Sequence, residues 1–511
     1  MKQEQTQKAQ LNKEQREQIE EAVREMRRKV EKNIEHKLKT VRDLESEPEN
    51  AEGNRKTIAN AIRREKDEDE TWEKALDDYI KGVGYTIVNR LTALRSMEVR
   101  GFIDREVTQF KGAKTPAAEP IIEDEFETEQ EATLKAYHRK CEELSEDIQI
   151  LFDTESPYHV ERPNYDVYKE LCETLDEIDD SLWLADDVLG WVYEYYNADD
   201  LEEVREKARE EGLDAEDTTI ANQFYTPHWV VRMLTDNSLG KLYLEENNKL
   251  LSAIDEQENL SIEERQERST HPSDTPRVED LCTYLVPTEE EGESTDYDNP
   301  SEIRVIDPAC GSGHFLLYAF DVLERIWRDE RPEIPNEEIP EKILENNIYG
   351  VDLDLRACQL ASFNLYLKAR TRAEDEGAEN FQMPEVGIVC SDSSISNLKE
   401  AEEVFEEVAG EEPKIEETLE EILEEFQEID GLGSLLDVRR SLKKHFIDGG
   451  DQDQPDLFDF EDSNYATLSS FINTLHDEIE EKHSNGKFLA QDLQSFLRLV
   501  KILSQNYDVS L

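Results

Sequence analysis

The chain has 511 residues, enough for two or three domains, and 124 acidic against 58 basic residues give a net charge of −66. It has no apolar run long enough to cross a membrane and no signal-peptide pattern, so we expect a cytoplasmic protein without membrane contact. The six cysteines are scattered and none has Cys-x-x-Cys spacing. This usage predicts buried thiols rather than a metal site or a disulfide framework.

The acidic residues are spread along the whole chain rather than gathered in one tail. At low salt such a protein would repel itself and any nucleic acid, but in molar salt the Debye length falls to roughly 3 Å and the repulsion is screened. The charge therefore predicts a haloarchaeal, high-salt cytoplasm rather than a particular partner. The alternative is an acidic disordered chain, and a hydrophobic content of 37% in periodic segments argues against it.

The first part of the chain is predicted to be helical. Residues 1–80 are rich in Glu, Lys, Arg and Gln, which predicts a charged, solvated helical arm. "YTIVNRLTALRSMEVRGF" predicts a core-facing helix, because its apolar residues recur at helical spacing. These residues are Ile87, Leu91, Leu94 and Met97. "KTPAAEPIIEDEFETEQE" at 114–131 is expected to be an acidic loop. "LWLADDVLGWVYEYYN" predicts a second core helix, and we expect one helical domain over 81–215.

From residue 216 the pattern predicts alternating strands and helices. "IRVID", "NIYGVDLD" and "EVGIVCSDS" are typical of buried strands, and long amphipathic helices follow the first two. This order favours a parallel, doubly wound sheet over 216–397. Residues 398–503 break the rhythm with acidic helical runs, which we interpret as an insertion. "NYDVSL" within 504–511 predicts the start of a fourth strand.

Three predicted strands each end at an aspartate, namely Asp307, Asp352 and Asp392. In a doubly wound sheet, ligands bind at the carboxyl ends of the strands. Gly311 and Gly313 follow the first strand and allow the backbone to turn tightly against a ligand. The loop has neither the Gly-x-Gly-x-x-Gly pattern nor the Gly-Lys-Ser/Thr of a phosphate loop, which argues against a nucleoside triphosphate. The acidic residue at the entrance of the loop also disfavours a phosphate and favours a cationic group.

The three aspartates suit different parts of one ligand. Asp307 is placed for a cationic amine, Asp352 for ribose hydroxyls and Asp392 for an exocyclic amine, while Leu353 is placed to pack on an adenine. Together these groups describe S-adenosylmethionine. The alternative is a structural α/β domain with ordinary strand-end turns.

"DPACGSGHFL" resembles the cofactor loop of N6-adenine DNA methyltransferases of the amino-methyltransferase type. "NQFYTPHWVVRML" at 222–234 is similar to the segment that closes over the methionine part in those enzymes. Taken alone, its Tyr-Thr-Pro turn would be a helix entry. The resemblance implies an S-adenosylmethionine site whose lining residues are Tyr225, Thr226, Pro227, Asp307, Pro308, Ala309, Cys310, Gly311, Ser312, Gly313, Phe315, Asp352, Leu353 and Asp392.

"NRLTALRSMEVRGF" and "ADDVLGWVYEYYN" are similar to segments of PglX-type methyltransferases of BREX phage-defence systems. The resemblance implies a helical domain followed by a Rossmann-like methyltransferase domain, double-stranded DNA as substrate and other BREX subunits as partners. Methyl transfer would go to adenine N6 of a base flipped from the duplex.

One part of the family pattern is missing. Such enzymes carry Asn-Pro-Pro-Tyr after strand four to hold the target adenine, and no such sequence occurs in this chain. We therefore expect an incomplete methyltransferase domain that is inactive alone. One alternative is a non-catalytic subunit or remnant that binds S-adenosylmethionine or only partner proteins and relies on a separately encoded C-terminal half. The other is the modification subunit of a type I restriction system. No catalytic or metal-binding residue is assigned.

Overall fold

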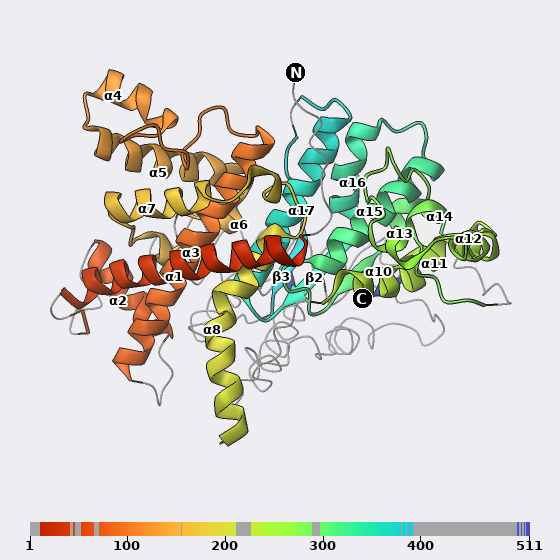
Figure 1. The fold of residues 1–511 in the computed structure, drawn as a ribbon, viewed down its shortest axis with the longest axis horizontal. Helices are drawn as coiled ribbons and strands as arrows, with labels where there is room; N and C mark the ends of the chain where they lie inside the picture. Colours follow the sequence, from red (N-terminus) through yellow and green to blue (C-terminus); the bar gives the residue numbers. More distant parts are fainter. Residues whose placement is uncertain are drawn as a thin grey trace, which may run out of the picture.

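The computed structural model describes residues 11–40, 44–45, 53–65, 71–154, 156–210, 226–288, 297–379, 381–384, 386–391, 498–499, 502, 505 and 507–511. In this part of the chain, a body of α-helices adjoins a small parallel β-sheet (Figure 1). This architecture agrees with the predicted combination of a helical region and an α/β region. Among the described residues, no helix is both long and apolar enough to span a membrane.

The N-terminal region is helical, as its sequence predicts. Its α-helices are α1 (Lys13–Thr40), α2 (Asn54–Glu65), α3 (Trp72–Arg100), α4 (Glu119–Glu125), α5 (Glu129–Asp147), α6 (Gln149–Phe152), α7 (Tyr165–Asp176) and α8 (Val188–Glu210). The described connections between them include the 3-10 turns η1 (Pro116–Ala118), η2 (Pro157–His159) and η3 (Asp180–Leu182).

Helix α3 is the centre of this region, and its predicted apolar face is confirmed. Ile87, Leu91, Leu94 and Met97 are all buried in one hydrophobic core. The helix begins where the Thr71 side chain accepts a hydrogen bond from the Lys74 N–H, and it ends at Gly101 in the left-handed conformation. Both ends therefore have the capping residues that a long helix requires.

Two expectations for the N-terminal region were wrong. Helix α1 is not solvated all round, because Ile19, Met26 and Ile34 are fully buried against α3 and α8. Apolar residues at this spacing form one stripe along a helix, even in a strongly charged sequence. The segment 114–131 is also not a loop. It contains η1, α4 and the start of α5, whose first turn is closed by a reciprocal capping box between Thr128 and Glu131.

A second helical stretch precedes the sheet, although the sequence suggested alternating strands and helices from residue 216. It comprises α10 (His228–Thr235), the π-helical turn η4 (Asp236–Gly240), α11 (Lys241–Glu246), α12 (Leu250–Gln257), α13 (Ile262–Gln266) and α14 (Val278–Leu281). Apolar side chains of α10, η4, α11, α12 and α14 join the same core as the sheet, whereas α13 lies at the surface with Ile262 exposed. In the part of the chain that the structure describes, the first strand begins at Val305.

The sheet has four described strands, all parallel, in the order β3-β2-β1-β4. Its elements in chain order are η5 (Pro300–Glu302), β1 (Val305–Asp307), α15 (His314–Glu330), η6 (Asn336–Glu338), α16 (Ile339–Asn346), β2 (Ile348–Asp352), α17 (Leu355–Asp375), β3 (Gly387–Cys390) and β4 (Val509–Ser510). The predicted strands, including the one in "NYDVSL", are confirmed. Val305 pairs with Ile348 on one side and with Val509 on the other. Most of the insertion predicted over 398–503 lies outside the described residues.

Both faces of the sheet are covered. Successive strand residues point to opposite sides, so neighbouring residues of one strand pack into different cores. Val305 and Ile348 pack with α15 and its neighbours in the second core. Ile306 and Val351 face the other way and pack against Leu499 and further apolar residues. A strand buried on both faces is typical of a parallel sheet.

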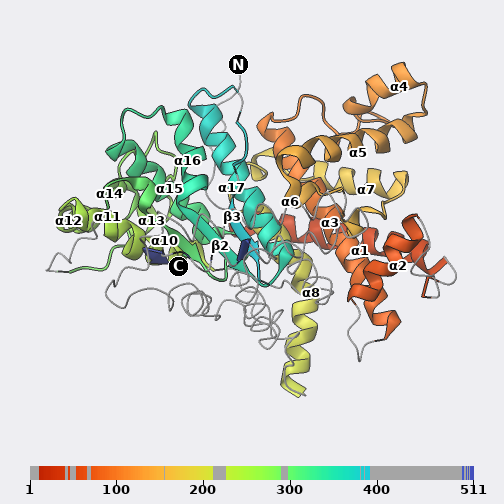
Figure 2. The same ribbon diagram turned by 180° about the vertical axis from the view of Figure 1, so that it is seen from behind.

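Helix α17 joins the two regions. Leu360 and Phe363 pack into the core of the N-terminal helices, whereas Ala361 and Leu365 pack into the core around the sheet. In both views of the fold, α17 stands between the N-terminal helices and α15 (Figure 2). The position of the strand-end loops is thereby tied to the N-terminal region.

Candidate cofactor site

The carboxyl ends of β1 and β2 bring two of the predicted aspartates to one edge of the sheet. Asp307 ends β1 and Asp352 ends β2, which are adjacent and parallel. The loop after β1 is fastened to β2 by two hydrogen bonds. The Cys310 N–H donates to the Val351 carbonyl at 2.9 Å, and the Gly311 N–H donates to the Asp352 carboxylate at 2.8 Å. One carboxylate therefore sets the position of the glycine loop.

The two glycines of this loop have different roles, although both have a positive φ, at 52° for Gly311 and 88° for Gly313. A Cβ on Gly313 would lie 3.1 Å from the Cβ and 3.2 Å from the Cα of Ala361 in α17, so close packing requires glycine here. A Cβ on Gly311 would meet nothing within 4 Å. Gly311 thus leaves open space at the loop, as an approaching ligand would need.

Asp307 is almost fully buried but only half satisfied. Asp307 is 4% exposed, and its Oδ1 accepts a hydrogen bond from the Ala309 N–H at 3.1 Å. Oδ2 has no hydrogen-bond partner among the described residues. Burial raises the pKa of this carboxyl to about 7, and the nearby Asp352 adds to the effect. A buried carboxylate oxygen without a partner is costly, and a bound cation or donor would remove that cost.

Asp352 is better satisfied. Besides Gly311, the Asp354 N–H donates to its carboxylate at 2.9 Å. Burial raises the pKa of Asp352, and these two backbone donors oppose the shift. The carboxylate is thus held in a fixed orientation at the strand end, with remaining acceptor capacity for a ligand hydroxyl.

The other predicted residues vary in accessibility. In the loop, Pro308 and Ala309 are exposed, Gly311 and Phe315 are half-buried, and Cys310, Ser312 and Gly313 are buried, while Leu353 after β2 is half-buried. Thr226 and Pro227 precede α10, which packs on α15, the helix that follows the loop. Tyr225 and Asp392 lie outside the described residues. Ser391, at the end of β3, donates its N–H to the Asp352 carbonyl at 2.8 Å.

The sequence interpretation missed the contribution of α8 to this site. The Tyr193 hydroxyl donates to the Asp354 carboxylate at 2.9 Å, and Gly190 lies directly against His314 and Ser312 of the glycine loop. "GWVYEYYN" was interpreted as a core helix, and its apolar spacing carries no signal for a contact with residues more than 100 positions away. The six cysteines are free and buried, as predicted.

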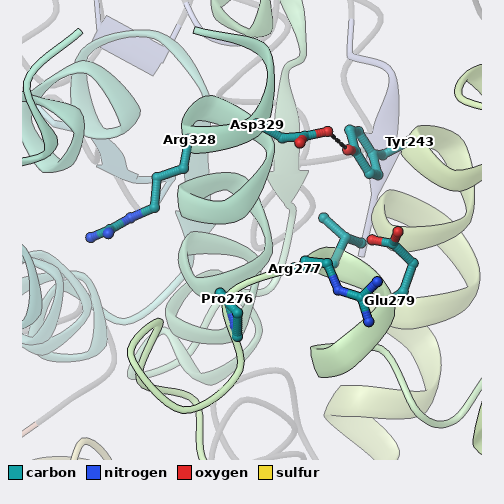
Figure 3. A pocket seen from close by; sticks show the side chains of 7 residues that line it. Tyr243, Pro276, Arg277, Glu279, Arg328 and Asp329 are labelled. Carbon is teal, nitrogen blue, oxygen red and sulfur yellow. Dashed lines mark hydrogen bonds between the residues drawn. The ribbon is translucent and has the colours of Figure 1, made fainter. Parts of the chain in front are cut away.

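A separate cleft of about 110 Å³ lies near the other end of α15 (Figure 3). Tyr243, Arg277 and Glu279 line it together with Asp329, whose carboxylate accepts a hydrogen bond from the Tyr243 hydroxyl. Sites for ligands of drug size typically have volumes of roughly 300–1,000 Å³. This cleft is therefore too small for an adenosyl group, and the strand-end loops remain the candidate site.

Comparison with known proteins agrees with the geometry. Residues 297–386, which contain β1, the glycine loop and β2, match the DNA-methyltransferase domain of MmeI. Adenine-specific methyltransferase BrxX of Escherichia coli is 29% identical over 337 residues, covering 60% of this chain and 26% of BrxX. Adenine-specific methyltransferase PglX of Lacticaseibacillus casei is 27% identical over 338 residues, covering 59% of this chain and 26% of PglX.

A shorter match is to PglX of Streptomyces coelicolor, which is 31% identical over 112 residues, covering 21% of this chain and 9% of that protein. The chain spans about a quarter of the length of BrxX and of the Lacticaseibacillus PglX. The resemblance inferred from "DPACGSGHFL" and "GWVYEYYN" is confirmed. Over 60% of its length, the chain is a homologue of the adenine-specific methyltransferases named BrxX and PglX.

Proposed function

We propose that this chain carries the S-adenosylmethionine site of an adenine-specific DNA methyltransferase of a BREX-type phage-defence system. The observation that carries the proposal is the pair of strand-end carboxylates Asp307 and Asp352 at one edge of the sheet, where Asp352 accepts the Gly311 N–H and Asp307 Oδ2 has no partner among the described residues. The similarity to proteins named adenine-specific methyltransferases supports the reaction class. Double-stranded DNA and other BREX subunits as partners, and a cytoplasmic location, belong to the same proposal.

The residues present fit this cofactor. The Oδ2 atom of Asp307 lacks a partner among the described residues, and it would accept a hydrogen bond from the cationic amine of the methionine part. Asp352 is oriented for the ribose hydroxyls, and the open side of Gly311 would admit the ligand against the backbone. Leu353 would pack beside the adenine, with Tyr225, Thr226 and Pro227 closing over the methionine part.

When bound, S-adenosylmethionine supplies an activated methyl group on a sulfonium. The contribution of this chain is to bind and orient that group. Asp307 would also favour a positive charge near the methionine end, because an ionised carboxylate in a dry site attracts a cation strongly. We assign the cofactor-binding half of a Rossmann-like methyltransferase domain to 216–397 and the helical domain to 81–215. The β3-β2-β1-β4 order supports the Rossmann-like assignment.

The first test is calorimetric titration of the purified chain with S-adenosylmethionine in molar salt. We expect binding at a stoichiometry of one, with competition by S-adenosylhomocysteine and adenosine. Absence of binding would contradict the proposed function.

A DNA methylation assay distinguishes catalysis from cofactor binding alone. We expect the chain on its own to bind the cofactor and to leave adenine unmodified, because no Asn-Pro-Pro-Tyr sequence is present to hold the base. Adenine methylation by the purified chain would contradict this second expectation while supporting the cofactor site.

A further inference from the structure

Helix α8 of the N-terminal region contacts both strand-end loops of the candidate site. Gly190 lies against the loop after β1, where a Cβ would come within 2.5 Å of His314 Nε2 and 3.0 Å of Ser312 Oγ. One turn further along α8, the Tyr193 hydroxyl donates to Asp354 Oδ2 in the loop after β2, at 2.9 Å. The start of α8 lies beside α17 in both views of the fold (Figures 1 and 2).

Asp354 connects Tyr193 to the predicted ribose-binding carboxylate. Its side chain is 8% exposed, and it caps α17 by accepting the Arg356 N–H at 2.8 Å. The Arg356 guanidinium donates to both carboxylate oxygens, at 2.9 Å to Oδ1 and 3.0 Å to Oδ2. The Asp354 N–H in turn donates to Asp352 at 2.9 Å. A displacement of Asp354 would therefore displace Asp352.

The charge state of Asp354 suits this arrangement. Burial alone would raise the pKa of its carboxyl, but the Arg356 guanidinium and its hydrogen bonds outweigh burial and hold the pKa below the ordinary value. Asp354 is thus an ionised, nearly buried group with several donors, and such a group has little freedom to move. Among these donors, the Tyr193 hydroxyl is the one that comes from α8.

We propose that Tyr193 is a positioning residue for the ribose of the cofactor, acting through Asp354 on Asp352. This inference rests on the proposed function and deepens it, because it assigns part of the cofactor site to the N-terminal helical region. The hydrogen bond joins residues 161 positions apart and fixes α8 to the end of β2. Gly190 fixes the same helix to the glycine loop, so α8 sets the spacing between the two loops that hold the ligand.

Tyr196, on the same helix, provides a matched control. Both tyrosine rings contact the ring of Tyr85 edge to face, with centroid distances of 6.1 Å for Tyr193 and 5.1 Å for Tyr196. The Tyr196 hydroxyl instead donates to Glu31 at 2.9 Å, away from the cofactor site. Tyr193→Phe and Tyr196→Phe therefore each remove one buried hydroxyl from α8 and keep the aromatic packing. The two variants differ in the carboxylate that loses a donor.

The experiment is calorimetric titration of the full chain and both variants with S-adenosylmethionine and with adenosine, in molar salt. We expect Tyr193→Phe to weaken both ligands about three- to tenfold, because misplacement of a hydrogen-bonding carboxylate reduces the affinity for the group it binds. Tyr196→Phe is expected to leave both affinities unchanged. Thermal unfolding followed by circular dichroism checks that the two variants lose similar stability.

Each outcome decides one question. If the unmodified chain binds neither ligand, the proposed function and this inference both fail. If the unmodified chain binds and Tyr193→Phe binds equally well, the inference alone is overturned. An equal loss of affinity in both variants would also overturn it, because general packing of α8 would then account for the effect.

Discussion

Strands β1 and β2 both end in an aspartate at the same edge of the sheet, yet the two aspartates differ in how many hydrogen bonds they accept. Asp307 keeps one carboxylate oxygen without a partner among the described residues, and burial raises its pKa to about 7. Asp352 accepts hydrogen bonds from Gly311 and Asp354. The carboxylate at the end of β1 thus lacks a partner for one oxygen among the described residues, whereas the carboxylate at the end of β2 is held by two backbone donors. We infer that a ligand brings its positive charge to the end of β1 and its hydroxyl groups to the end of β2.

Substitution of the two glycines of the loop after β1 is expected to lower the free energy of unfolding by different amounts. Gly313→Ala would place a side chain at positive φ, which costs about 1–2 kcal/mol, and against α17, which costs about 1–3 kcal/mol more. Gly311→Ala would have only the first cost, because its Cβ meets nothing within 4 Å. Urea unfolding in molar salt measures both. Equal losses would contradict the close contact between the loop and α17.

Asp352→Ala tests the carboxylate at the end of β2. The variant loses the acceptor of two backbone donors and the predicted ribose contact, so we expect the affinity for S-adenosylmethionine to fall about 10- to 100-fold. Asp329→Ala removes a carboxylate from the same acidic chain, at the separate cleft near the far end of α15, and serves as the control. Calorimetric titration measures both variants. An unchanged affinity in Asp352→Ala would remove the ribose assignment.

Asp307→Asn tests the carboxylate at the end of β1 through the pH dependence of the free energy of unfolding. The pKa of Asp307 is about 7 in the folded chain, well above its ordinary value of 3.8. Between about pH 4 and pH 7 the folded state therefore binds more protons than the unfolded state, and the contribution of this group to the free energy of unfolding falls as pH rises. Because asparagine has no such ionisation, the variant should be more stable than the unmodified chain above about pH 7, by up to about 4 kcal/mol, and similar near pH 4.

Ligand binding should show the opposite trend. The unmodified chain should bind S-adenosylmethionine more tightly as Asp307 ionises between about pH 6 and pH 8, because the ligand is cationic at this end. Asp307→Asn should lose this rise and bind about three- to tenfold more weakly near pH 8. Thermal unfolding and titration at several pH values check both trends. A variant that binds with the same pH dependence would show that Asp307 does not face the charge.

Local sequence signals predicted the strands and the glycine loop, because short runs of buried, strand-forming residues and small residues after a strand depend on neighbouring positions. They failed where the deciding contact is distant or where composition obscures spacing. In α1 the high content of charged residues pointed to a solvated helix, although an apolar stripe that includes Ile19 and Ile34 is buried. Pro120 lies in the first turn of α4, so a residue type that is common in loops instead opens a helix within 114–131. The contact from Tyr193 to Asp354 joins segments that only the folded chain brings together.

The most direct test of the central claim is a crystal structure of the chain with S-adenosylhomocysteine. We predict that the ribose hydroxyls contact the Asp352 carboxylate and that the amine of the amino-acid part lies at Asp307, across the open side of Gly311. A ligand bound in the cleft beside Tyr243, or a ribose away from Asp352, would contradict the assignment of the two loops.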